Sequence, residues 1–317
     1  MDYSQIRGFN YQPSYGSTSF ENWLNFDPSM IELELRRGKE YFPGFNAVRY
    51  WLSWDAYIRN PEQFIANFET GLSIADRLGI KAIPCLFNRW HDSELDCGGI
   101  YIDHFMPCSS FLYREDNFDK YVTEVVSNHI GDDRILVWDI CNEPFPYMDI
   151  NDIPIELEKN EYAWLERMYN LIKRIDKNKL VGVSLHHAHG LAGVERIEPI
   201  SDILLVHPYY IPQLMKKEEY VDLVSTYKEF STRCNKPILA TETCWGAMDD
   251  ARRVEIIRYT LDTLSEYKIG FVVHALHYSK VADLHTPEGG PIGWSENLAF
   301  TNADGTLRAG HDIFNNY

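Results

Sequence analysis

The sequence predicts a (β/α)8 barrel, the TIM-barrel fold. The chain of 317 residues contains eight short apolar runs, separated by longer stretches with the apolar spacing of amphipathic helices. Runs that are apolar at nearly every residue are typical of strands buried on both faces, as in a parallel sheet covered by helices. Eight such strands alternating with helices can close into a barrel. Because no linker rich in Pro, Gly or Ser divides the chain, we expect residues 1–317 to form one domain.

The eight predicted strands are Ile6–Tyr11, Ala47–Trp54, Lys81–Trp90, Arg134–Cys141, Leu180–His187, Asp202–Tyr210, Pro237–Trp245 and Ile269–Ser279. The predicted helices are Pro28–Phe42, Pro61–Gly79, Asn117–His129, Ile155–Lys177, Leu191–Ile197, Glu218–Cys234 and Asp249–Tyr267. The second helix illustrates the signals, with Pro61 in its first turn and Gly79 at its end. Two long connections, Asn88–Glu115 and Asp283–Gly305, follow strands and would emerge at the carboxyl-end face, where barrel enzymes have their active sites.

Composition restricts the possible ligands. The formal net charge of −17 argues against nucleic acid, whose phosphates require clustered Lys and Arg, and also against anionic membranes and polyanionic substrates. A neutral ligand fits this charge. Aromatic residues make up 14% of the chain, which suits either a large core or a site for flat amphipathic ligands such as sugars. The sequence has no apolar run of transmembrane length and no signal-peptide pattern, so we expect a cytoplasmic protein, or a secreted or periplasmic one whose leader has been removed.

Two glutamates stand at strand ends. The fourth predicted strand runs into Asn142-Glu143-Pro144, and the seventh contains Thr241-Glu242-Thr243. A barrel places the fourth and seventh strands on opposite sides of one mouth, so the two carboxyl groups would face each other. Hydrolysis of a glycosidic bond needs such a pair: one protonated group assists the leaving oxygen, and one ionised group attacks the anomeric carbon or activates water. One strand-end glutamate alone could equally form a surface salt bridge.

With these strand ends the sequence resembles the retaining glycoside hydrolases of clan A, and within that clan the cellulase-like family 5. The resemblance implies that Glu143 is the general acid/base and that Glu242 is the nucleophile. It also implies that Asn142, which precedes the acid/base, contacts the sugar 2-hydroxyl. We therefore expect a retaining β-glycosidase that acts on a neutral β-linked oligosaccharide or polysaccharide.

Further positions match the same family. The resemblance implies that Arg49 on strand two hydrogen-bonds the nucleophile, that His91 follows strand three, and that strand six carries His207 and Tyr209, with Tyr209 holding the nucleophile. Opposite charge and hydrogen bonding at Glu242 would favour its ionised form, and the anion would then push the acid/base toward protonation. For retention we predict carboxyl groups about 5–5.5 Å apart, whereas a separation above about 6.5 Å would indicate inversion.

Strand eight departs from the family pattern, because it lacks the tryptophan that usually forms the floor of the subsite for the cleaved sugar. His277, Tyr278 or Trp294 are the candidates to replace it. Trp245 and Trp294 are the preferred candidates for stacking on a sugar, since aromatic faces complement the apolar faces of pyranose rings. Trp138 lies in the middle of a strand and is expected in the core.

Other residues leave alternatives open. His186, His187 and His189 end strand five and could bind a metal, contact the substrate or support a loop; we predict no metal and no cofactor. Cys97 and Cys108 could pair in an oxidising compartment, and the strand-associated cysteines are expected as buried free thiols. Two functions compete with the glycosidase: a carbohydrate-binding or transglycosylating barrel with weak hydrolysis, and a metal-dependent barrel hydrolase.

Overall fold

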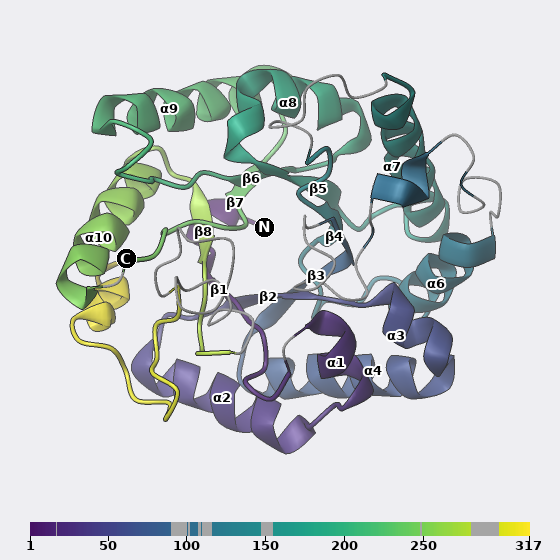
Figure 1. Ribbon diagram of the computed structural model, residues 1–317, viewed down its shortest axis with the longest axis horizontal. Coiled ribbons are helices and arrows are strands. Elements are labelled where there is room, and N and C mark those ends of the chain that lie inside the picture. The colour runs from purple at the N-terminus through teal and green to yellow at the C-terminus, as the bar shows by residue number, and fades with distance from the viewer. Residues whose placement is uncertain are drawn as a thin grey trace.

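The chain forms a closed barrel of eight parallel strands surrounded by helices (Figure 1). The computed structural model describes residues 1–16, 18–89, 100, 102–106, 109, 116–146, 155–247, 249–279 and 298–317. Each strand pairs with the next in sequence order, and β8 closes the ring by pairing with β1, where Gly8 lies opposite Val272. The predicted (β/α)8 barrel is therefore confirmed.

All eight predicted strands are present, although most are shorter than the apolar runs that predicted them. They are β1 Arg7–Asn10, β2 Ala47–Trp51, β3 Lys81–Asn88, β4 Trp138–Asn142, β5 Val181–His186, β6 Leu204–His207, β7 Ile238–Ala240 and β8 Gly270–Val273. The shorter strands matter for function, because residues that follow the last strand hydrogen bond can turn their side chains into the mouth of the barrel. Glu242 is one of them, two residues beyond the last residue of β7.

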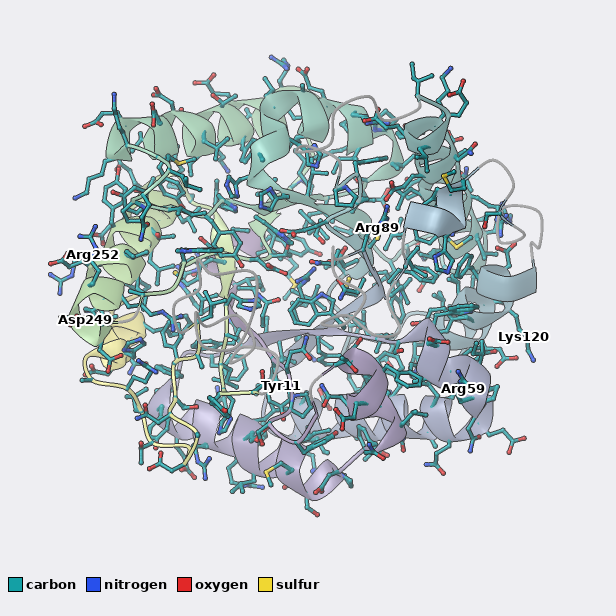
Figure 2. The ribbon with its side chains drawn as sticks, viewed as in Figure 1. Tyr11, Arg59, Arg89, Lys120, Asp249 and Arg252 are labelled. Carbon is teal, nitrogen blue, oxygen red and sulfur yellow. The ribbon has the colours of Figure 1, made fainter. Side chains whose placement is uncertain are left out.

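The seven predicted helices are found, with bounds within two residues of those expected: α2 Pro28–Tyr41, α4 Pro61–Arg77, α6 Asp116–Ser127, α7 Ile155–Ile175, α8 Gly190–Ile197, α9 Lys217–Cys234 and α10 Asp250–Glu266. Two helices of six residues were not predicted, α1 Ser19–Leu24 and α3 Trp54–Arg59. Short 3-10 helices cover Tyr3–Gln5, Ile102–Phe105, His187–His189, Glu198–Ile200 and His311–Asn316. Charged side chains such as Lys120 and Arg252 lie at the outer rim, whereas Arg89 lies inside the ring of helices (Figure 2).

The side chains inside the barrel are arranged in layers. An apolar layer near the amino ends of the strands includes Ala47, Ile83, Leu205, Leu239 and Val272. Because side chains alternate between the two faces of a strand, residues two positions further along point the same way. This second layer, which lies closer to the mouth, is polar and comprises Arg49, Cys85, His207, Thr241 and His274.

Strand β5 follows the same inward row through Gly182, Ser184 and His186. A Cβ at Gly182 would lie 2.8 Å from Leu205 Cγ, so glycine leaves room for the apolar layer at that level. Ser184 is fully buried, and His186, at the end of the row, is partly exposed. The period of two in the strand therefore leads from a packed core to polar groups at the mouth.

Described cysteines are unpaired: Cys85, Cys141 and Cys244 are buried, as expected, and Cys234 is partly exposed. Cys97 and Cys108 lie outside the described residues. Within the described part of the chain, every helix is too short or too polar to span a bilayer.

Candidate active site

Glu143 is held in a strained backbone conformation at the end of β4. Its φ is +44° and that of Phe145 is +62°, in the left-handed region that is unfavourable for residues other than glycine, by about 1–3 kcal/mol each. Two hydrogen bonds fix this turn: the Glu143 N–H donates to the Ser184 carbonyl (3.0 Å), and the Phe145 N–H donates to the Glu161 carboxylate (3.1 Å). Glu161 in turn accepts a hydrogen bond from Arg89 (3.0 Å). The side chain of Glu143 is thereby set in the mouth, where the residue is only 2% exposed.

Glu242 has two strong hydrogen-bond donors. Arg49 Nη1 donates to Oε1 (2.6 Å), and the Tyr209 hydroxyl donates to Oε2 (2.8 Å). Burial raises the pKa of this carboxyl, but the charges of His207 and Arg49 and the hydrogen bond from Tyr209 outweigh burial, so its pKa lies well below the usual range. Glu242 is therefore an anion at neutral pH.

Arg49 is the centre of a buried polar network. The guanidinium is fully buried, and Asp139 Oδ2 accepts from its Nε at 2.9 Å. Burial lowers the pKa of Arg49, but the Asp139 charge and the neighbouring anions outweigh it and hold the group protonated. Besides Glu242 and Asp139, its acceptors are Asn10 Oδ1 (2.9 Å), Asn142 Oδ1 (2.8 Å) and Ser184 Oγ (3.0 Å). Such a planar donor fork fixes the position of Glu242 relative to four strands.

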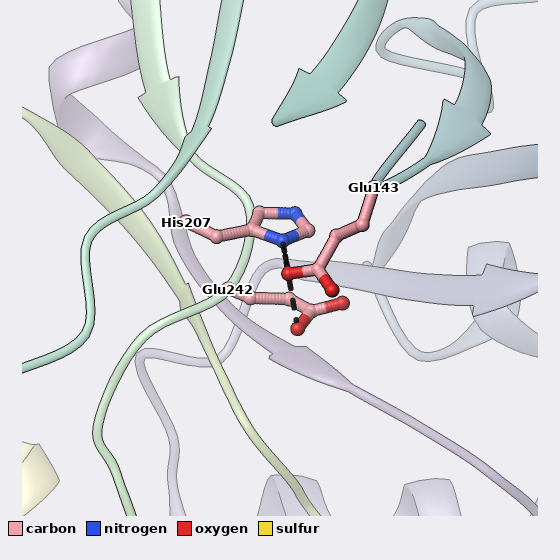
Figure 3. A group of neighbouring side chains, drawn as sticks. All are labelled: Glu143, His207 and Glu242. Atoms are coloured by element: carbon pink, nitrogen blue, oxygen red, sulfur yellow. Dashed lines mark hydrogen bonds and ion pairs between the residues drawn. The ribbon is translucent and has the colours of Figure 1, made fainter. Parts of the chain in front are cut away.

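The two carboxylates meet at one imidazole nitrogen (Figure 3). His207 Nδ1 lies 2.7 Å from Glu143 Oε1 and 3.7 Å from Glu242 Oε2. One oxygen of each carboxylate and a ring nitrogen of His207 all lie within 4.8 Å of one another. The nearest carboxylate oxygens are therefore closer than the about 6.5–9.5 Å spacing that leaves room for an inverting water, as the shorter spacing of a retaining pair requires.

The proton state of Glu143 differs from the sequence-based expectation. Burial and the charge of Glu242 raise its pKa, but His186 and His207 outweigh them and lower it. The expected push of Glu242 toward protonation of Glu143 is present, but the net direction is the opposite, because sequence analysis did not place the two histidines beside the carboxyl. Since the Glu143–His207 contact is 2.7 Å long, a proton on Nδ1 lies within direct transfer distance of the Glu143 oxygen.

Among the described residues, Glu143, His207 and Glu242 form the cluster of potential metal ligands, and the strand-five histidines do not join it. Arg49 already places a positive charge 2.6 Å from Glu242. A second cation at the same carboxylate would be opposed by that charge. That the reaction requires no metal ion stays a prediction.

The sequence model described as cellulase (glycosyl hydrolase family 5) matches residues 41–280, more than half of the chain. The chain belongs to glycosyl hydrolase family 5. It is thus a glycosidase of a retaining family, and the span of the match includes β2 to β8 together with Glu143 and Glu242.

Several solved structures share the family 5 barrel. An exo-β-1,4-mannosidase from Opitutaceae bacterium strain TAV5 has 18% identity and a TM-score of 0.74, covering 98% of this chain and 58% of that one. A GH5_18 protein variant from Streptomyces cattleya in complex with Manβ1-4GlcNAc has 15% identity, a TM-score of 0.68, and coverage of 98% and 79%. An endo-1,4-β-D-mannanase from Thermotoga petrophila RKU-1 has 15% identity, a TM-score of 0.63, and covers 98% of each chain. The chain thus spans little more than half the length of the exo-mannosidase. No significant match was found among curated protein sequences.

Most of the site residues predicted from the sequence that the structure describes are linked to one another at the mouth by hydrogen bonds or ring contacts. These residues are Arg49, Asn142, Glu143, His207, Tyr209, Glu242 and Trp245. Trp245 is partly exposed, and its ring lies edge-on to that of Tyr209 with centroids 5.3 Å apart. His91 and Trp294 lie outside the described residues, as does Trp90.

Both ring nitrogens of His277 have partners outside the pair of site carboxylates. Its Nδ1 donates to the Tyr278 carbonyl (2.8 Å), and Arg37 Nη1 donates to its Nε2 (3.1 Å). Glu34 lies 3.6 Å from Nδ1, and the residue is 3% exposed. The role of His277 as a replacement for the strand-eight tryptophan stays a prediction.

Sequence reasoning did not select two residues that face the site, His274 and Trp51. His274 lowers the pKa of Glu242, and its ring lies edge-on to Trp51 at a centroid distance of 6.0 Å. Arg49 lies over the Trp51 ring at 4.9 Å. The alternation of side chains along a strand could have identified both. His274 lies two residues after Val272, and Trp51 lies two residues after Arg49, so each points into the barrel as the earlier residue does.

Proposed function

We propose that the protein hydrolyses β-glycosidic bonds by double displacement, with Glu242 as nucleophile and Glu143 as general acid/base. The observation that supports this assignment is the asymmetry of the pair. Glu242 accepts from Arg49 and Tyr209, whereas Glu143 is paired with His207, a group that can hold or give up a proton. A nucleophile must be ionised, and an acid/base must exchange a proton twice in each cycle.

In the first step, Glu242 attacks the anomeric carbon and forms an ester as the bond to the leaving oxygen breaks. The leaving oxygen takes a proton from Glu143, supplied in the free site by the Glu143–His207 pair. In the second step, Glu143 accepts a proton from water as the water oxygen attacks the same carbon and releases Glu242. Both attacks invert the anomeric centre, so the product retains the β configuration.

For the substrate, we propose a neutral β-linked oligosaccharide, with β-mannosides as the first choice. The support is the mannosidase, mannanase and Manβ1-4GlcNAc complex among the structural neighbours, together with a net charge that disfavours polyanions. The sugar that becomes attached to Glu242 would lie on the side of His274, which lowers the pKa of Glu242, and of Trp51, whose ring lies edge-on to that of His274.

The test is a panel of aryl β-glycosides, β-mannoside and β-glucoside first, with the configuration of the initial product followed by NMR. Glu242→Gln should abolish turnover and leave binding intact, while Glu266→Gln, an exposed carboxylate at the end of α10, should change neither. Unchanged hydrolysis by Glu242→Gln, or an initial α product, would refute the proposal. Loss of wild-type activity on chelation would favour a metal-dependent hydrolase, and binding without turnover a carbohydrate-binding barrel.

Azide separates the two roles. In Glu143→Ala, azide should attack the glycosyl-enzyme and yield the β-glycosyl azide from an aryl glycoside whose leaving group needs no acid. In Glu242→Ala, azide should displace the leaving group directly and yield the α-glycosyl azide. If Glu143→Ala gave the α-glycosyl azide and Glu242→Ala the β-glycosyl azide, the roles of nucleophile and acid/base would be reversed.

A further inference from the structure

Three buried polar atoms around Glu143 have no hydrogen-bond partner among the described residues. They are Glu143 Oε2, His187 Nδ1 and His207 Nε2, and they belong to consecutive barrel segments at the ends of β4, β5 and β6. Buried polar atoms are nearly always hydrogen-bonded, so a group of exceptions requires an explanation. Since the three residues lie at the ends of neighbouring strands beside the Glu143 carboxyl, polar groups of a ligand in the mouth would offer partners that the described residues do not.

The end of β5 positions two of the imidazoles in this region. His186 ends the inward row and lies opposite His207 in the strand register. His187 starts the following 3-10 helix, and the two rings have centroids 4.2 Å apart. The ring of His187 also lies edge-on to Tyr209 at 6.2 Å, which places it beside the catalytic pair. Both histidines are partly exposed, so part of each residue is accessible to a ligand.

The chemistry of the reaction identifies the ligand, given the proposed function on which this step rests. His274 acts on the charge of Glu242 and lies edge-on to Trp51, so we place the sugar that forms the ester on that side. The leaving oxygen must lie at Glu143, so the remainder of the leaving group extends toward β5. Burial, followed by the nearby His186, lowers the pKa of His187 to about 3, so this imidazole is neutral. A neutral imidazole offers one donor and one acceptor, which matches a sugar hydroxyl.

We propose that His187, packed on His186, binds a hydroxyl group of the leaving sugar and makes the enzyme selective for bonds between two sugars. The site would thus discriminate by the leaving group as well as by the sugar that is transferred. A leaving group without a hydroxyl at this position, such as an aryl group, would not form the hydrogen bond to His187.

The test compares two substrates with the same transferred sugar: a β-linked disaccharide and a dinitrophenyl β-glycoside. His187→Leu should reduce kcat/KM for the disaccharide about 10-fold, the effect of one lost net hydrogen bond, and leave the dinitrophenyl glycoside within about 2-fold. His187→Asn carries an amide near the position of Nδ1 and should retain most of the disaccharide activity. His129→Asn, an imidazole ahead of β4 and so at the opposite end of the barrel, is the control.

Equal losses on both substrates, or an unchanged disaccharide rate in folded His187→Leu, would overturn the inference. The leaving sugar gives a second measurement: added free, it should accelerate breakdown of the glycosyl-enzyme in the wild type by acting as acceptor, and much less in His187→Leu. Absence of that difference would also count against the site. If the wild type does not turn over the dinitrophenyl glycoside, the proposed function itself fails, which is a separate result.

Discussion

Removal of the Tyr209 hydroxyl tests the electrostatics of the nucleophile most directly. Tyr209→Phe deletes the donor 2.8 Å from Glu242 Oε2 and keeps the ring that packs edge-on against Trp245. A hydrogen bond to a charged group stabilises by about 1.5–3 kcal/mol and one between neutral groups by about 1 kcal/mol. Because one pKa unit corresponds to about 1.4 kcal/mol, the difference raises the pKa of Glu242 by about 1 unit.

The assay is the pH dependence of kcat/KM for an activated aryl β-glycoside, whose acid limb reports ionisation of the nucleophile in the free enzyme. In the wild type the depressed pKa of Glu242 keeps this limb below the usual carboxyl range, and in Tyr209→Phe the limb should move up by about 1 unit. The control is Tyr210→Phe, because the neighbouring Tyr210 packs its ring against Tyr220 and Tyr259.

The pH dependence of the stability of Tyr209→Phe should reflect the same change in the pKa of Glu242. A carboxyl whose pKa is lowered in the folded state contributes stability above its unfolded value of about 4.3, and that contribution is lost as pH falls through the folded pKa. Tyr209→Phe should therefore be less stable than the wild type at neutral pH, by about 1–2 kcal/mol, and the gap should narrow in acid. An acid limb that coincides with the wild type in a folded variant would refute the reasoning.

Four further substitutions test the charges and the packing of the barrel. Arg49→Met leaves the buried carboxylates of Asp139 and Glu242 without their shared cation, so the free energy of unfolding measured in urea should fall by about 3–5 kcal/mol; a loss below about 1 kcal/mol would contradict the network. Gly182→Ala should destabilise by about 1–3 kcal/mol, because its Cβ would lie 2.8 Å from Leu205 Cγ and from the Ile203 carbonyl oxygen. Gly71→Ala, in a helix with open space around the new Cβ, should instead stabilise by about 0.5–1 kcal/mol, and thermal unfolding of both variants compares them. His274→Ala should raise KM for β-glycosides and lift the acid limb of kcat/KM, whereas a pure loss of thermal stability with normal kinetics would assign His274 to the wall.

The regular part of the fold was predictable because its signals are long and periodic. The helices α4 and α7 each present an apolar stripe over many turns, and the strands are apolar on both faces because helices cover the sheet. The helices α1 and α3 have only six residues, too few for such a stripe. Their remaining signal is a single side-chain cap, Thr18 and Ser53 respectively, and a serine or threonine alone is also common in loops.

Within the site, the pair Glu143 and Glu242 and the donors Arg49 and Tyr209 could be selected from strand ends. The histidines at the mouth could not be assigned, because their roles depend on where pairing stops. His274 lies on an inward row and reaches the nucleophile, whereas His277, three residues later, has its ring nitrogens bound to Arg37 and Tyr278. A run predicted as one strand, Ile269–Ser279, contains both, and the apolar pattern does not show where β8 ends.

The same limit explains the wrong expectation for Glu143. The charge of a facing carboxylate was predictable from strand order, and by itself it raises the pKa of Glu143. The opposing effect comes from His186 and His207, which occupy paired positions on β5 and β6 and so approach the carboxyl from the same side. In the proposed mechanism, a sugar that displaces water from the site would disfavour the ionised form of Glu143 and so raise its pKa toward the protonated form that the leaving oxygen requires. The strained backbone at Glu143 places its oxygen within reach of both the histidine and the leaving group, and this position accounts for a glutamate held at a φ of +44°.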